Sequence, residues 1–216
     1  MKAKKDFNKN VVASLLTLFC LVAFQFYTTV QDVSAATAND DVIVTLDVTT
    51  GITISDGADA TMTPNLSIVS DSSIGSSSWL VKTNAALGYT LAVKASTTPA
   101  LESATSSLAN YTETVLGTPE AWSVGVGDKE FGYSAYGTDT PTGVWGTAAS
   151  CGAGGVPDAL QSYVGFSTSD KTIATRATVT PTTGILTTIC FAAEQNAVYA
   201  ASGTYTATIT ATATTL

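Results

Sequence analysis

Apolar and polar residues alternate along much of the chain, a pattern typical of β-strands with one buried face. The alternation predicts a first strand over residues 42–48, whose apolar face holds Val42, Val44, Leu46 and Val48. It also predicts an interior strand over residues 204–214, in which threonine fills every second position. Stiff, β-branched threonine favours extended backbone. Further strands are expected at 52–55, 65–69, 78–84, 89–94, 122–126, 131–136, 162–167, 173–180 and 185–192.

Turn residues separate these segments, as at Asp56-Gly57, Thr63-Pro64 and Ser202-Gly203. Helical periodicity is nearly absent, and only residues 100–108 suit a short helical turn. Many short strands at this spacing predict an all-β fold, an antiparallel β-sandwich of the Greek-key, Ig-like or jelly-roll-like kind. The Gly-rich stretch at 138–156 breaks the rhythm and predicts a long loop.

The N-terminus has the features of a secretory signal peptide, a helix-forming segment that precedes the mature domain. Four lysines within residues 1–10 precede an apolar run over 11–24, and Ala35-Ala36 supplies the small residues of a cleavage site. We expect a signal peptide at 1–36 and one sandwich domain at 37–216, secreted or displayed on the cell surface, with no membrane segment after cleavage. The alternative is an uncleaved anchor, because residues 11–30 approach the about 20 residues that a span requires.

Charge and composition narrow the function further. The whole chain has a net charge of −8, and five basic residues stand against fifteen acidic ones after residue 36. Such an acidic protein has no basic surface for nucleic acid. The chain contains no histidine, which excludes Ser-His-Asp and Cys-His catalysis, and we expect no enzymatic activity. A secreted hydrolase with a carboxylate pair drawn from Glu113, Glu120 and Glu130 is the remaining catalytic alternative.

Two cysteines, Cys151 and Cys190, follow the predicted leader. In an exported protein an even pair most simply forms a disulfide, and two buried free thiols are the alternative. Cys20 lies inside the apolar run after Phe19, a context that does not fit a lipoprotein site.

Two groups of residues are candidate ligand contacts. Asp56 and Asp59 offer oxygen atoms for calcium, although Ca²⁺ takes six to eight oxygen ligands. Apart from calcium, we expect no cofactor. Tyr136 and Trp145 lie in the region richest in aromatic residues and are candidates for stacking on sugar rings. Aromatic residues at alternate strand positions also suit a hydrophobic core.

The segment at 202–212 (SGTYTATITAT) resembles the closing strand of two bacterial surface families. These are the WxL-type cell-wall-binding domain and the group of spore-coat-U-like and fimbrial subunits. Trp79 and Trp122 resemble the tryptophans of the WxL type, but neither has leucine two residues later, and Ala211 stands where that family has tryptophan. The resemblance implies a β-sandwich outside the cell that binds wall polymer or copies of itself.

Together these observations favour a structural or adhesive surface protein, wall-associated without a covalent bond or pilin-like. Its expected partners are cell-wall polymer, other surface proteins, or further copies joined through the C-terminal strand. An extracellular carbohydrate-binding module is the main alternative.

The leader is predicted to be removed during export, because its small residues at 35 and 36 suit signal peptidase. Intact-mass measurement of the exported protein should place the N-terminus at Ala36 or Thr37. Recovery of residues 1–35 on the exported protein would contradict this expectation.

Overall fold

The computed structural model describes residues 13–20, 39–55 and 57–216, in two units divided between Asp47 and Val48. Residues 13–20 are helical. The rest of the predicted leader, with its cleavage site, lies outside the described residues. In the described ranges, no helix combines the length and the apolar character needed to cross a membrane.

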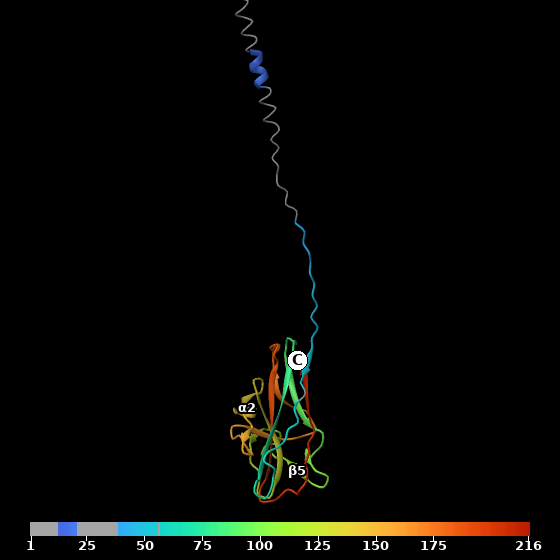
Figure 1. Ribbon diagram of the computed structural model, residues 1–216, viewed down its shortest axis with the longest axis vertical. Coiled ribbons are helices and arrows are strands. Elements are labelled where there is room, and N and C mark those ends of the chain that lie inside the picture. Colours follow the sequence, from blue (N-terminus) through green and yellow to red (C-terminus); the bar gives the residue numbers. More distant parts are fainter. Residues whose placement is uncertain (1–12, 21–38, 56) are drawn as a thin grey trace, which may run out of the picture. The chain divides into compact units, whose positions relative to one another are not determined.

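The larger sheet of the domain has three long strands at its centre (Figure 1). In spatial order its main path is β1 (Ile52–Ile54), β2 (Ser72–Thr83), β12 (Ile185–Gln195), β7 (Lys129–Gly137), β10 (Ser162–Gly165) and β6 (Glu120–Ala121). A short hairpin joins this sheet through a parallel pairing with β7, and it consists of β4 (Leu101–Glu102) and β5 (Ser107–Asn110).

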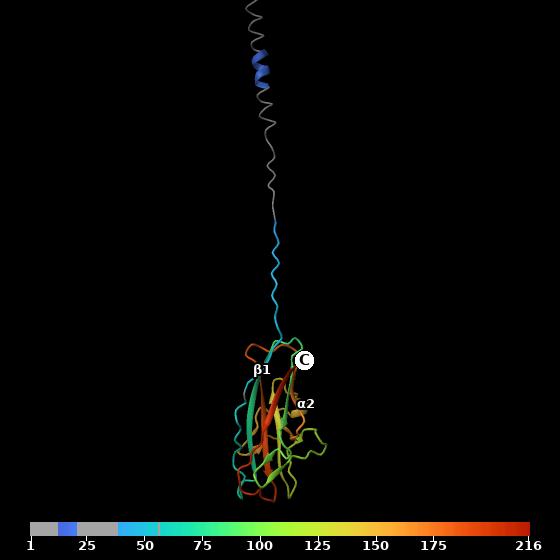
Figure 2. The same cartoon turned by 90° about the vertical axis from the view of Figure 1, so that its right-hand side faces the viewer.

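A three-stranded antiparallel sheet packs against the larger one (Figure 2). Its order is β11 (Lys171–Arg176), β3 (Tyr89–Ala95) and β13 (Ile209–Thr215). A four-residue helix, α2 (Thr142–Trp145), and a small hairpin of β8 (Gly152–Ala153) and β9 (Val156–Pro157) lie within or beside the predicted loop at 138–156. Antiparallel sheets packed in this way confirm the predicted all-β sandwich.

The hydrophobic core fills the space between the two sheets. Tyr89, Leu91 and Val93 alternate along β3 and are fully buried against the inward residues of the larger sheet, such as Ile189 and Phe191. Burial of a side chain of this size stabilises the fold by roughly 1.5–3 kcal/mol. The period-two pattern of the sequence is therefore explained by one face of each strand entering this core.

The central strand β12 is buried on its outer face as well. Its outward residues Cys190 and Ala192 pack with Tyr111 and Tyr163 in a second apolar cluster. Cys151 reaches this cluster and forms the predicted disulfide with Cys190 across 39 residues of sequence. The segment around Cys151 is thereby fastened over the outside of the larger sheet.

Two of the expected strands are wrong in an informative way. Residues 42–48 form no strand, and their apolar side chains are exposed. The C-terminal strand is shorter than expected, at Ile209–Thr215, and it lies at the edge of its sheet rather than in the interior. Tyr205 precedes it in an irregular segment.

Smaller differences concern the loops. Residues 65–69 contain only an isolated bridge at Ser67, and residues 122–126 are irregular. The expected helical turn at 100–108 is the β4–β5 hairpin, in which Leu101 pairs with Leu108 and both leucines are buried.

We predict that replacing both cysteines with serine (C151S/C190S) lowers the free energy of unfolding by roughly 4 kcal/mol, because the disulfide restricts the unfolded chain. Urea denaturation of wild type and variant measures this difference. Alkylation of the native protein without reduction should label neither Cys151 nor Cys190, and labelling of both would contradict the account.

Candidate functional site

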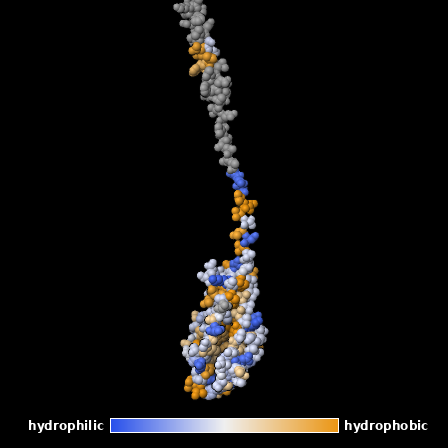
Figure 3. Space-filling model, turned by 45° about the vertical axis from the view of Figure 1, so that its right-hand side comes forward, coloured by the Kyte–Doolittle hydropathy of each residue, from blue (hydrophilic) through white to orange (hydrophobic). Residues whose placement is uncertain are grey.

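The most unusual surface of the described chain is the apolar segment at residues 42–48. Val42, Val44, Leu46 and Val48 are 81%, 87%, 84% and 75% exposed, and Ile43 is 90% exposed. Figure 3 shows apolar side chains gathered along this part of the chain. A contiguous row of exposed aliphatic residues in an otherwise polar stretch marks an interaction site.

The chain is fastened to the domain directly after this segment. The side chain of Asn84 donates from Nδ2 to the carbonyl oxygen of Thr49 at 2.7 Å, and its Oδ1 accepts from the N–H of Gly51 at 2.7 Å. The backbone N–H of Asn84 also donates to the carbonyl of Gly51. Residues 49–51 are therefore a fixed point from which β1 begins.

A second unusual feature is the outer edge of β13. Thr208 accepts a hydrogen bond from Ser96, and Leu216 donates one to Gly88. Because hydrogen-bonded pairs alternate along an antiparallel ladder, the even residues of β13 bond to β3. The N–H and C=O groups of Ile209, Ala211 and Ala213 consequently point away from β3, and within the described chain no strand pairs with them.

The side chains along this edge are only half-buried. Ile209, Ala211 and Ala213 face inward and pack against the core but keep part of their surface exposed, whereas the threonines between them face solvent. On the neighbouring side of the sandwich, Ile52 in β1 is also half-buried, and β1 approaches β13. We call the outward backbone groups and inward side chains of Ile209–Thr215 the β13 edge.

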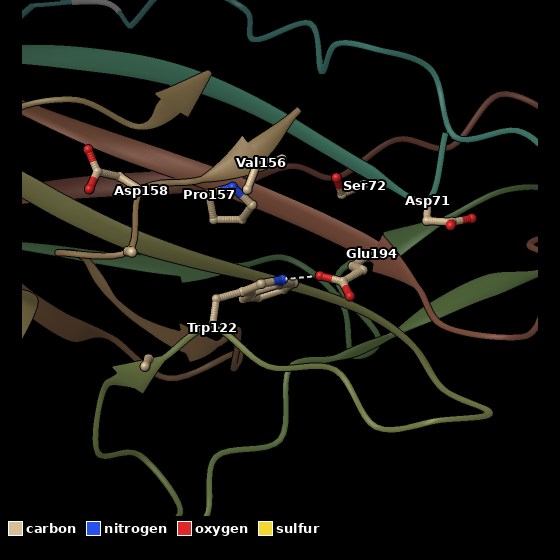
Figure 4. Close-up of a pocket in the computed structure, with 9 residues that line it drawn as sticks. Asp71, Ser72, Trp122, Val156, Pro157, Asp158 and Glu194 are labelled. Atoms are coloured by element: carbon tan, nitrogen blue, oxygen red, sulfur yellow. Dashed lines mark hydrogen bonds between the residues drawn. The ribbon is translucent and has the colours of Figure 1, made fainter. Parts of the chain in front are cut away.

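A shallow depression of about 470 Å³ lies on another part of the domain, around Trp122 (Figure 4). The indole Nε1 donates to Glu194 Oε2 at 2.6 Å, and the ring stacks on Tyr111 with centroids 4.6 Å apart. Asp71 and Asp158 also line the depression. Hydrogen bonds from Ser150 and from the backbone of Leu160 lower the pKa of the Asp158 carboxyl.

The aromatic ring in this depression is already engaged by the protein itself, since one face contacts Tyr111 and the N–H is occupied by Glu194. In the part of the chain that the structure describes, no group of three or more acidic, cysteine or histidine residues has a metal-binding arrangement. The site was not visible in the sequence, because Trp122 and Glu194 are 72 residues apart.

Two of the three acidic residues considered for hydrolysis, Glu113 and Glu120, hold backbone segments in place. Glu113 accepts hydrogen bonds from the backbone N–H groups of Gly165 and Gly117. Glu120 accepts from Thr114 at 2.9 Å. Glu130 is buried in β7, and this burial raises the pKa of its carboxyl.

The predicted ligand contacts differ in their exposure. Trp145 is fully buried in the core beside Tyr133, so its ring has no exposed face for a sugar, and Tyr136 is half-buried. Asp59 is exposed, whereas Asp56 lies outside the described residues.

No family model, curated protein or solved structure matches this chain. The fold and the sites thus define a disulfide-containing β-sandwich with an exposed apolar segment and an unpaired sheet edge. The resemblance to the WxL-type and fimbrial families stays a prediction.

We predict that E130Q stabilises the domain at neutral pH. Folding raises the pKa of Glu130. Its contribution to the free energy of unfolding is therefore fully present below its pKa in the unfolded chain, and it is lost as the pH rises through its pKa in the folded protein. Glutamine keeps the size and polarity of the side chain without the buried charge. Urea denaturation between pH 3 and 8 should show the variant gaining on wild type as the pH rises.

The exposed Glu102 offers a matched control, and E102Q should follow the wild-type curve. Parallel curves for E130Q and wild type would contradict the assignment.

Proposed function

We propose that this protein is a non-enzymatic structural subunit of the cell surface that associates with copies of itself through residues 42–48. The observation that carries this proposal is the row of exposed aliphatic side chains on one face of that segment. The predicted secretory leader and the disulfide support a location outside the cell.

Residues 42–48 are better suited to pairing with another strand than to exposure to solvent. Burial of Val42, Val44, Leu46 and Val48 would contribute roughly 1.5–3 kcal/mol for each side chain. Ordering the backbone costs about 1–2 kcal/mol per residue, so burial alone does not suffice and backbone hydrogen bonds must add to it. A sheet edge supplies both, because an added strand gains main-chain hydrogen bonds and buries alternate side chains.

The charge distribution favours a protein partner over an anionic polymer. Five basic residues against fifteen acidic ones after residue 36 leave little positive charge for anionic wall polymer. Copies of an acidic protein repel one another over most of their surface, and they therefore need an uncharged contact. Residues 42–48 contain a single charge, at Asp47.

Two substitutions on the apolar face, V44D/L46D, should weaken self-association by at least about 100-fold, since two buried aliphatic contacts are lost and two charges are placed at the contact. Sedimentation velocity of the exported protein over a range of concentrations measures the effect. The matched control is T45D, which changes the opposite face of the same segment and should still associate. Wild-type protein that stays monomeric at every concentration would refute the proposal.

A further inference from the structure

We propose that the β13 edge receives residues 42–48 of a second copy as an additional strand, which extends the three-stranded sheet to four strands. This inference rests on the proposed self-association and names the surface that accepts the segment. In this pairing the C-terminal strand, which was expected in the interior of its sheet, accepts the added strand at the edge.

The outer backbone groups of β13 can form hydrogen bonds with such a strand. The N–H and C=O groups of Ile209, Ala211 and Ala213 point outward, and the described chain provides no strand that pairs with them. An incoming strand forms hydrogen bonds with alternate residues of an edge. β13 and the segment 42–48 are both seven residues long, so the segment matches the full length of the edge.

The side chains match in the same way. On β13 the inward positions are apolar and half-buried, and the outward positions are threonine. On residues 42–48 one face is aliphatic, and the other includes Thr45 and Asp47. If the aliphatic face points inward, it covers the exposed remainder of Ile209 and Ala211, and Thr45 then lies beside the solvent-facing threonines. A shift by one residue would turn the aliphatic face to water. Only registers that differ by an even number of residues therefore keep this face buried.

The other sheet edges are less suitable. On β11 the N–H of Thr175 already donates to the Asp139 carbonyl at 3.0 Å, and Arg176 forms an ion pair with the Asp139 side chain. β11 also has an irregular register after Thr172, and charged or irregular edges resist strand addition. β1 and β6 have only three and two residues.

The occupant is a second copy, because the chain cannot easily reverse before its own domain. Only Thr49 and Thr50 separate Val48 from Gly51, and Asn84 holds both ends of this link. Tight hairpin turns require positive φ, as glycine or asparagine provides. Residues 49–51 contain no such conformation, and β-branched threonine disfavours it.

Disulfide trapping tests the pairing directly. Cysteine at Thr45 is combined with cysteine at Thr210, Thr212 or Thr214 in the exported protein, whose native cysteines are already bonded to each other. Mild oxidation at concentrations where wild type associates should give covalent ladders on non-reducing gels for at least one of these pairs. The matched control, T45C/T175C, places the second cysteine on the exposed face of β11 and should give none.

Three results would each overturn the inference. The ladders could form equally with T175C, the assemblies could yield no ladder from any β13 position, or the crosslinks could be confined to one chain. A wild-type protein that never associates defeats the proposed function instead, so the two failures are distinguishable.

A second pair of variants gives an independent readout. A211F places a bulky ring on the inward side of the β13 edge and should reduce association at least tenfold, whereas T212F on the outward side should leave it within about twofold. Circular dichroism and the thermal midpoint identify any variant that has lost its fold. Equal association of a folded A211F and of wild type would contradict docking at this edge.

Discussion

The register of β12 between β2 and β7 is the constraint on which the rest of the domain depends. This register directs Ile189 and Phe191 into the core and turns Cys190 outward to its disulfide with Cys151. It also places Glu194 where Trp122 can donate to it. Because successive side chains of a strand alternate between faces, a slip of one residue would exchange the core and the outer cluster. The positions of the core residues, of the disulfide and of the depression around Trp122 therefore all depend on the hydrogen bonds that β12 forms with β2 and β7.

Alternation in the sequence predicts most of the core strands, because β3, β7 and β12 each present apolar residues to it. It misses the first half of β2, where Ser72 to Ser77 carry few apolar side chains and pairing with β12 holds the backbone extended. It places a strand at residues 42–48, where this chain forms none. The pattern states which face of a segment would be buried, and it contains no information about which molecule supplies the sheet.

The candidate sites were less accessible from the sequence. An aromatic-rich stretch suggested Tyr136 and Trp145 as sugar contacts, yet Trp145 is a core residue. The contact of Trp122 with Glu194 and the unpaired edge of β13 both arise from strand order, which brings together distant parts of the chain. The threonine-rich C-terminal strand was correctly expected to have one apolar face, but its half-buried state becomes apparent only when its position at the edge of the sheet is known.

If a second copy completes the sheet at β13, amide hydrogen exchange along that strand should change when the protein assembles. In dilute monomer the amides of Thr210, Thr212 and Thr214 should be protected by their bonds to β3, whereas those of Ile209, Ala211 and Ala213 should exchange rapidly. In assembled protein we expect the amides of Ile209, Ala211 and Ala213 to become protected, whereas those of Thr210, Thr212 and Thr214 change little. Assembly that leaves Ile209, Ala211 and Ala213 exchanging as in the monomer would contradict it.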